Sequence, residues 1–351
     1  MLTFMWIEEQ VMRRDLDRLL KAPLPWSRLD GKTVLVTGAT GLIGSVVVNS
    51  LLYYGLQTQD PPQVLALVRN EEKARRMLGA QLDQCPNLRL VTGDVTTLTL
   101  PEGPVDYIIH AASQTASRAM VEEPVETILT TVEGTRRMLE LAKDRHSLGM
   151  VYLSSMEVYG TQPQGKRVTE NDVGAMLPTK IRNSYPLSKQ LAECLCASYA
   201  SEYGVPVRML RLAQTFGPGV PLEDRRVFAM IARCAMHGED VVLRTTGESS
   251  HSFLYTMDAV SSILKVLLEG ESGQAYTAAN EETYCSIADM ARMVCAKFSG
   301  GKSQVVFDLG ENTVYPDTSY LDLDTSKLQA LGWKAEYGLA EMYENMMATM
   351  K

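Results

Sequence analysis

From Lys32 onwards, short apolar segments typical of β-strands alternate with segments of helical character. Helices are expected after the first strand through Leu52, at residues 71–78 and at residues 125–143. Apolar strands that recur between helices indicate a parallel sheet covered on both faces, which predicts an α/β fold. Beyond Phe216 the pattern loosens, as expected for a smaller second lobe. The expected strands cover residues 33–36, 64–68, 88–92, 107–110, 150–153 and 207–210.

Length and charge narrow the possible classes of protein. The chain has 351 residues, of which 45% are hydrophobic and 22% are charged, a composition typical of globular proteins. At about 150 residues per domain, this length predicts about two domains. Lys and Arg number 34 against 42 Asp and Glu, and the formal net charge is −8. An acidic chain without a basic block is a poor partner for a phosphate backbone, so we expect no nucleic-acid partner.

Cysteine spacing and hydropathy indicate a cytosolic protein. The six cysteines form no CxxC pair and no zinc-type spacing, so we expect free thiols and no metal site. Free thiols are typical of a reducing cytoplasm. No apolar stretch approaches the ~18 residues of a membrane span, and charges between Glu8 and Asp15 interrupt any signal-peptide core. Residues 5–21 predict an amphipathic helix that packs on the surface or against a partner subunit.

A glycine-rich turn, Thr37-Gly38-Ala39-Thr40-Gly41-Leu42-Ile43-Gly44, joins the first strand to the first helix. Gly38 lets the chain turn off the strand, Gly41 lets backbone approach a pyrophosphate, and Gly44 allows close packing of helix on sheet. The N–H groups of the following helix, from Leu42 and Ile43 onwards, point at the anion. This context predicts a dinucleotide site rather than a tight turn without a ligand.

The end of the second expected strand bears on which dinucleotide binds. An acidic residue there would favour NAD, but this chain has Arg69, whose fork geometry suits a 2′-phosphate. The cofactor is therefore NAD(P), with a narrow preference for NADP. Asp94, followed by Val95, is placed to meet the adenine amino group, although a turn-forming role for an Asp after glycine is about equally supported.

Tyr185-Pro186-Leu187-Ser188-Lys189 carries the chemistry. Pro186 suits the first turn of a helix, so Tyr185 lies at its mouth and Lys189 one turn further on the same face. An ammonium beside a phenol should lower the pKa of the phenol, which could then act as a base near neutral pH. Ser155, at the end of an expected strand, can hydrogen-bond the same substrate oxygen.

These motifs, with Ile109–Ala112, Ser155–Gly160 and Arg211–Pro218, occur in an order that resembles the extended short-chain dehydrogenase/reductase family. This is the family of nucleotide-sugar epimerases and dehydratases, and there is similarity to UDP-glucuronate decarboxylases. The resemblance covers roughly residues 31 to 345. It implies a Rossmann-type doubly wound parallel sheet and a smaller C-terminal substrate-binding lobe.

The resemblance also implies how the chain is divided and assembled. The expected parts are an N-terminal helical extension, a dinucleotide-binding domain and a nucleotide-sugar-binding lobe, at residues 1–30, at 31–215 with roughly 252–275, and at 216–251 with 276–351. A homodimer would form through the helices that include Tyr185. Ala111 and Ala112 would lie beside the cofactor, and Ser113 toward the substrate.

The implied reaction begins with hydride removal from C4 of a nucleotide-diphosphate sugar, with the cofactor tightly bound and recycled. Tyr185 takes the hydroxyl proton, Ser155 shares it, and Lys189 holds the cofactor ribose. A 4-keto sugar results, from which an epimerase, a 4,6-dehydratase or a decarboxylase can proceed. Glu157 favours C5 chemistry, because a carboxylate near C5 can remove that proton; the alternative is a polar residue that faces loop backbone.

Several positions depart from the pattern that the resemblance implies. Met156 stands where dehydratases carry an acid and decarboxylases a serine, and His251 where decarboxylases carry an arginine. Gln214 and Thr131 replace asparagines and suggest tuning for the substrate. Arg226 would face the diphosphate. We expect an epimerase or dehydratase ahead of a decarboxylase, an NADPH-dependent keto-sugar reductase, or a cofactor-sensing protein without activity.

Overall fold

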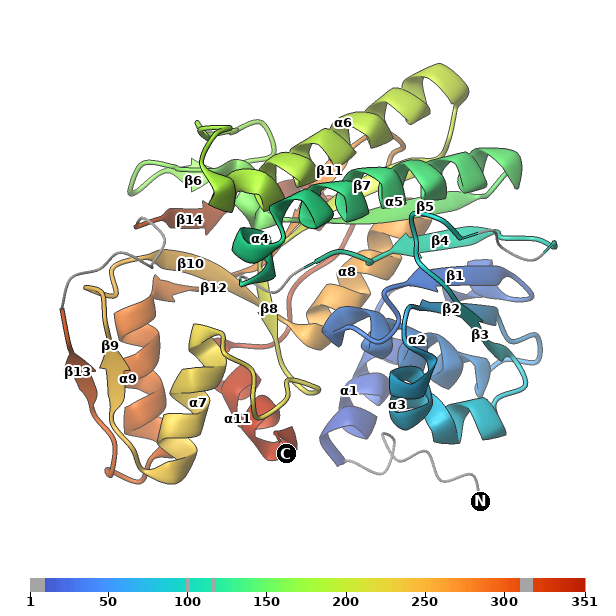
Figure 1. Cartoon of the computed structure of the whole chain (residues 1–351). Helices are drawn as coiled ribbons and strands as arrows, with labels where there is room; N and C mark the ends of the chain where they lie inside the picture. Colours follow the sequence, from blue (N-terminus) through green and yellow to red (C-terminus); the bar gives the residue numbers. More distant parts are fainter. Residues whose placement is uncertain (1–9, 99–101, 115–117, 310–317, 351) are drawn as a thin grey trace.

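The computed structural model describes residues 10–98, 102–114, 118–309 and 318–350, and its centre is a seven-stranded sheet (Figure 1). The strand order is β3-β2-β1-β4-β5-β7-β11, and every adjacent pair is parallel. This order reverses direction between β1 and β4, where an open α/β sheet forms a crevice at the carboxyl ends of its strands. The strands are β1 (Thr33–Thr37), β2 (Gln63–Val68), β3 (Leu88–Thr92), β4 (Tyr107–His110), β5 (Gly149–Ser155), β7 (Val207–Leu212) and β11 (Ala275–Ala278).

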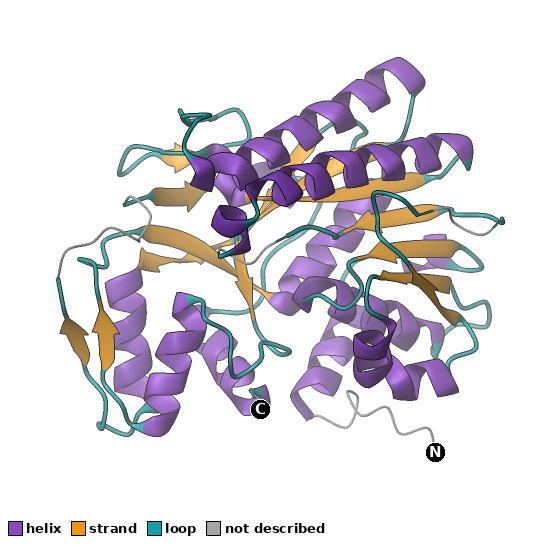
Figure 2. Ribbon diagram, viewed as in Figure 1, coloured by secondary structure: helices purple, strands orange, loops and turns teal. Residues whose placement is uncertain are grey.

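Helices cover both faces of this sheet (Figure 2), as the run of apolar strands predicts. In β1 all five residues are buried; Val34 and Val36 belong to one core cluster and Leu35 to the other. Successive side chains of a strand point to opposite faces, so a strand buried on both sides is apolar throughout. The covering helices are α2 (Leu42–Gly55), α3 (Glu71–Gln84) and α8 (Thr256–Glu269) on one face, and α5 (Pro124–Asp144) and α6 (Ser184–Tyr203) on the other.

A second layer of strands lies beside the carboxyl edge of the large sheet (Figure 1). Its order is β12-β10-β14-β6, with β8 paired to β10, and a separate parallel pair is formed by β9 and β13. The strands are β6 (Arg167–Val168), β8 (Gln214–Phe216), β9 (Val241–Leu243), β10 (Ser250–Tyr255), β12 (Asn280–Ser286), β13 (Val305–Phe307) and β14 (Tyr320–Leu323). The helices that accompany them are α7 (Val227–His237), α9 (Ile287–Phe298), α10 (Ser326–Gln329) and α11 (Leu339–Thr349).

Some strands from one part of the chain pair in the other layer. β6 and β8 come from within residues 31–216 but pair in the second layer, and β10 lies there through Tyr255. β11 extends the large sheet through Ala278. The chain therefore passes between the two layers more than once.

Helix α1 (Gln10–Lys21) packs against α2, α8 and α11, so its inner face lies on this chain; residues 5–9 of the expected helix lie outside the described residues. Its Asp15 is buried and accepts hydrogen bonds from the hydroxyls of Tyr255 and Tyr337. The remaining short elements are α4 (Ala119–Glu122) and the 3-10 helices η1 (Trp26–Leu29), η2 (Met156–Tyr159) and η3 (Ile181–Asn183).

All six cysteines are unpaired, and Cys194 is exposed while Cys196 is buried. Within the described ranges, no helix combines the length and apolar character needed to cross a bilayer. In the same part of the chain, no three potential ligands among His, Cys, Asp and Glu come together as a metal site would require.

Candidate active site

The strand ends surround a cleft of about 530 Å³ between the two layers. Its lining includes most of the residues singled out from the sequence; Asp94 and His251 are not among them. The site residues that line it are Gly38, Gly41, Leu42, Ile43, Gly44, Arg69, Val95, Ala111, Ala112, Ser113, Ser155, Met156, Glu157, Tyr185, Lys189, Gln214 and Arg226.

The glycine turn has the shape of a phosphate cradle. Gly38 has φ +66°, and an added Cβ would lie 2.9 Å from the backbone of Ala111. A Cβ on Gly44 would lie 2.2 Å from the carbonyl oxygen of Gly38, so only glycine fits there. Gly41 caps α2 in an extended conformation without a side-chain bond to the helix, which leaves the N–H groups of the first turn for an anion. The turn therefore fits a dinucleotide pyrophosphate.

Thr37, which the sequence analysis did not single out, joins this turn to the next strand. Its Oγ1 accepts hydrogen bonds from the backbone N–H groups of Ala111 (3.1 Å) and Ala112 (3.0 Å). The same oxygen lies 2.8 Å from Nδ1 of His110. Burial lowers the pKa of His110 to about 3, so this imidazole is neutral and serves as a hydrogen-bonding group within the core.

Arg69 and Asp94 were both proposed to recognise the adenosine part of the cofactor, but only Arg69 lines the cleft. Arg69 lines the cleft after β2. Asp94 instead accepts hydrogen bonds from the backbone N–H (2.8 Å) and the hydroxyl (2.6 Å) of Thr96, as a turn-forming aspartate does. Asp94 is not among the residues that line the cleft, whereas Val95 is.

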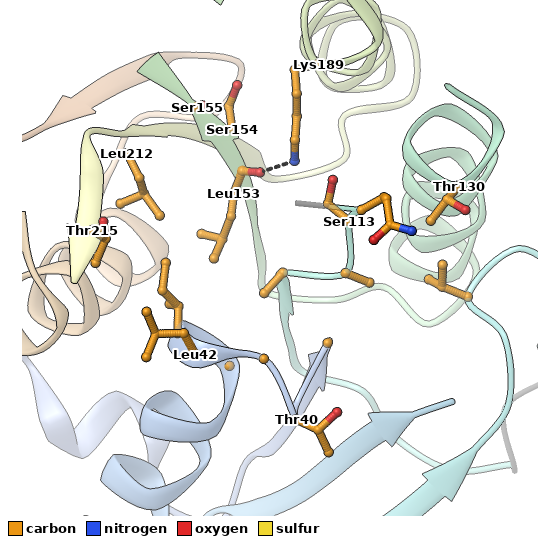
Figure 3. A pocket seen from close by; sticks show the side chains of 18 of the residues that line it. Thr40, Leu42, Ser113, Thr130, Leu153, Ser154, Ser155, Lys189, Leu212 and Thr215 are labelled. Atoms are coloured by element: carbon orange, nitrogen blue, oxygen red, sulfur yellow. Dashed lines mark hydrogen bonds between the residues drawn. The ribbon is translucent and has the colours of Figure 1, made fainter. Parts of the chain in front are cut away.

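The residues predicted to be catalytic meet where β5 ends and α6 begins. Pro186 lies in the first turn of α6, and Lys189 follows one turn after Tyr185. Figure 3 shows Lys189 reaching across to β5, where its Nζ donates to the carbonyl of Leu153 at 2.7 Å. Ser155 lies beside it at the end of the same strand, and its Oγ accepts a hydrogen bond from the N–H of Glu157. Ser113 faces the same space from the opposite wall, and its buried hydroxyl has no protein partner.

The expected lowering of the pKa of Tyr185 by Lys189 is wrong for this arrangement. Burial, followed by the charge of Glu157, raises the pKa of Tyr185 well above its ordinary value. A hydrogen bond with Ser155 and the charge of Arg182 oppose this rise, but not enough to reverse it. The ammonium of Lys189 is directed at the Leu153 carbonyl and lies 5.8 Å from the centre of the Tyr185 ring. The phenol therefore keeps its proton in the cofactor-free protein.

Burial also lowers the pKa of Lys189 to about 7, because the charged form is poorly solvated. Between about pH 7 and the ordinary value of 10.5, the unfolded chain holds a proton on this lysine that the folded chain has lost. The free energy of unfolding of the cofactor-free protein should therefore rise with pH across this window, by up to about 1.4 kcal/mol per pH unit relative to Lys189→Met. Denaturant titrations across this pH range measure the difference; parallel pH profiles of the two proteins would contradict it.

A buried ion pair beneath the catalytic residues escaped the sequence analysis. Glu193, one turn beyond Lys189 on α6, receives 2.7 and 3.0 Å hydrogen bonds from Arg211 of β7. The hydroxyl of Ser154 donates to the same carboxylate at 2.5 Å. These contacts tie α6 to the strand ends that carry Leu153 and Ser155. The K-x-x-x-E spacing, which puts both side chains on one helix face, is the signal from which Glu193 could have been found.

Glu157 has an unexpected partner. Both of its carboxylate oxygens accept hydrogen bonds from the guanidinium of Arg182, at 2.9 and 3.0 Å. Arg182 belongs to η3, three residues before Tyr185, and was not among the expected site residues. Glu157 is thus held by an ion pair that the sequence did not predict, and its carboxylate still lines the cleft.

The residues proposed to contact the substrate fall into two groups, those that line the cleft and one that does not. Gln214 and Arg226 line the cleft, and the guanidinium of Arg226 is paired with Asp224 at 2.6 Å. His251 lies in β10 between β12 and β14, where its Nε2 meets the hydroxyl of Ser319 at 2.7 Å. Burial lowers the pKa of His251 to about 4, so this imidazole is uncharged at neutral pH, unlike the arginine that decarboxylases carry at this position.

The fold and the cleft together define a dinucleotide-dependent enzyme of the short-chain dehydrogenase/reductase type. The chain belongs to the NAD dependent epimerase/dehydratase family, whose family model matches residues 34–280. It is 30% identical to UDP-glucuronic acid decarboxylase 6 of Arabidopsis thaliana over 88% of this chain and 85% of that protein. It is 29% identical to UDP-glucuronic acid decarboxylase 1 of Xenopus tropicalis, over 90% and 71%.

Solved structures show the same fold. The dTDP-glucose 4,6-dehydratase of Bacillus anthracis in complex with NAD aligns with a TM-score of 0.71 and 20% identity, over 90% of this chain and 95% of that one. The UDP-glucose 4-epimerase of Thermotoga maritima with UDP-glucose aligns with a TM-score of 0.74 and 20% identity, over 90% and 97%. The predicted Rossmann-type fold and the predicted family are confirmed.

Proposed function

We propose that this enzyme oxidises C4 of a nucleotide-diphosphate sugar to a ketone and returns the hydride after a second step. The observation that carries the proposal is the convergence of Ser155, Tyr185 and Lys189 in one cleft with the glycine turn. Gly41 to Ile43, Arg69, Ala111 and Lys189 would hold the cofactor, which supplies a hydride acceptor when bound. Because the phenol keeps its proton without cofactor, Tyr185 would act as the base for the C4 hydroxyl only in the loaded enzyme, where the positive charge of an oxidised nicotinamide would lower the pKa of the phenol. Ser155 would bond the same substrate oxygen.

For the second step we favour a reaction of the epimerase or 4,6-dehydratase type. Met156 lines the cleft with an apolar side chain and offers no proton to a leaving C6 hydroxyl, which weakens ordinary dehydration. A decarboxylase acting on a glucuronate is the second candidate, and the two UDP-glucuronic acid decarboxylases among the relatives favour it. A reductase that consumes NADPH is a further alternative, which copurification of a tightly bound cofactor would argue against.

One experiment separates these reactions. The purified enzyme is incubated with uridine, thymidine, cytidine and guanosine diphosphate sugars, and the products are analysed by mass spectrometry after chromatography. Loss of water indicates a dehydratase, loss of CO₂ a decarboxylase, and unchanged mass with a new retention time an epimerase. No change with any of these sugars, in protein that binds its cofactor, would contradict the proposed function.

The finer choice of cofactor rests on Arg69. Its guanidinium lies at the end of β2 in the cleft, where it could pair with a 2′-phosphate, which supports NADP. The solved dehydratase described above contains NAD. Arg69→Ala should weaken NADP binding by roughly 10- to 100-fold and leave NAD binding within a few fold, because only the phosphate contact is lost. Calorimetric titration of both cofactors tests this; equal effects on the two would refute a phosphate contact.

We further propose a homodimer through α5 and α6. Val125, Ile128 and Leu129 are exposed within one turn of α5 and form an apolar face, and Leu191 is exposed on α6. Exposed apolar patches of this kind mark interaction surfaces. Sedimentation at micromolar concentration would show a dimer that Leu129→Glu dissociates, and a monomeric wild-type protein would rule this interface out.

A further inference from the structure

Glu157 lines the cleft, and its ion-pair partner Arg182 lies directly beside it without being among the lining residues. Glu157 follows Ser155 and Met156 at the end of β5, and Arg182 comes from η3, just before the helix that carries Tyr185. Two hydrogen bonds of 2.9 and 3.0 Å join the two groups in a fork, and both side chains stay partly exposed, at 31% and 27%. A bidentate pair of this kind fixes orientation as well as charge. The pair therefore has a defined geometry, and the proposed chemistry gives a role to Glu157 but none to Arg182.

The pairing limits what Glu157 can do. A carboxylate accepts a proton through an oxygen lone pair, and here one lone pair of each oxygen is engaged with an N–H of Arg182. For Glu157 to turn toward C5 of a sugar, at least one of these hydrogen bonds must break. Breaking a charge-assisted bond without a replacement is costly, so another anion at Arg182 would make the movement easier.

The other cations of the cleft have different partners or positions. Lys189 donates to the Leu153 carbonyl, and Arg226 is paired with Asp224. His251 is neutral and is not among the residues that line the cleft. Arg69 and Lys73 line the cleft near the end of β2. Arg182 is the cation that contacts Glu157, and its five N–H donors can serve two carboxylates in turn.

We propose that Arg182 is a specificity-determining residue that binds a carboxylate at C6 of the sugar by exchanging its partner, Glu157, for the substrate. This inference rests on the proposed function. A substrate with a C6 carboxylate draws the guanidinium away and leaves Glu157 free beside C5. A neutral hexose leaves the pair closed, so Glu157 remains engaged. The enzyme would thereby couple C5 chemistry to the presence of an acidic sugar.

The test uses binding of a matched pair of sugars, UDP-glucuronate and UDP-glucose, to the cofactor-loaded protein by calorimetry. Arg182→Gln should weaken UDP-glucuronate by roughly 10- to 100-fold, as expected for loss of a hydrogen bond to a charged group, and change UDP-glucose little. Arg182→Lys should restore part of the affinity. Glu157→Gln should tighten UDP-glucuronate, because Arg182 is then no longer occupied. Arg225→Gln, which removes an exposed arginine, is the matched control.

The two variants are expected to change UDP-glucuronate affinity in opposite directions, which distinguishes substrate recognition from a purely structural role. If the pair only stabilised the loop, both variants would weaken both sugars together, and the proposal for Arg182 would fail. In the double variant the gain from Glu157→Gln should vanish; a gain that persists would mean that Arg182 does not bind the carboxylate. Failure of the proposed function is seen separately, because wild-type protein would then reduce its cofactor with none of the uridine, thymidine, cytidine or guanosine diphosphate sugars tested above. Normal cofactor reduction with an unchanged sugar preference in Arg182→Gln would count against the inference alone.

Discussion

Replacement of Tyr185 by phenylalanine is expected to lower kcat by about 1,000-fold, within the range for loss of a general base. The change removes one oxygen and leaves the ring, which is 6% exposed and packed where α6 begins. Affinity for cofactor and nucleotide sugar should stay within a few fold. Stopped-flow absorbance of the nicotinamide would show that hydride transfer itself is slowed, because the C4 hydroxyl cannot lose its proton.

Tyr152→Phe is the matched control. Tyr152 is buried close to the same lysine, whose Nζ lies 4.7 Å from its ring centre, but it does not line the cleft. This variant should retain its activity. A Tyr185→Phe enzyme with full activity would remove Tyr185 from the proposed mechanism, whereas an equal loss in both variants would point to a packing effect.

Replacement of Gly44 by alanine should abolish cofactor binding and destabilise the fold. The new Cβ would lie 2.2 Å from the Gly38 carbonyl oxygen, and this neighbour is backbone that cannot rotate away. Relieving such overlap typically costs about 1–3 kcal/mol and would move α2 away from the pyrophosphate cradle. Thermal unfolding with and without dinucleotide measures both effects, because bound ligand raises the melting temperature only where the cradle is intact.

Gly79→Ala gives the opposite expectation in the same experiment. Gly79 lies inside α3, and a Cβ there would meet nothing within 4 Å. Alanine should stabilise this helix by about 0.5–1 kcal/mol. If Gly44→Ala bound cofactor normally, the close approach of α2 to the strand would not be required for the site.

Local patterns in the sequence were sufficient to predict the parallel α/β sheet and the glycine turn beside it. The predicted strands at 33–36, 64–68 and 107–110 match β1, β2 and β4 within a residue, because strands buried on both faces must be apolar throughout. The glycine spacing was sufficient to locate the phosphate cradle, since Gly38 and Gly44 have no room for a side chain. Helix α3 continues to Gln84, beyond the predicted end at residue 78, with Gln81 buried under Asn49.

The errors concern charges whose partners are distant in the sequence. Nothing near Glu157 indicates that Arg182, 25 residues away, would occupy both of its oxygens. Likewise, the spacing of Tyr185 and Lys189 was correct, but the pKa of the phenol depends on burial, which several elements create together. For Asp94 the sequence left two roles open, and the structure contains a turn-type hydrogen bond from Thr96 to its carboxylate.

The sequence by itself determined the parallel α/β framework, the glycine cradle and the identity of the Ser155, Tyr185 and Lys189 set, because these depend on backbone sterics and periodic burial within short segments. Only the tertiary structure decided the charge states of Tyr185 and Lys189, the pairing of Glu157 with Arg182 and the position of His251 outside the cleft wall. Electrostatic free energies depend on desolvation and on distances between groups that folding brings together, and neither quantity is encoded in spacing along the chain.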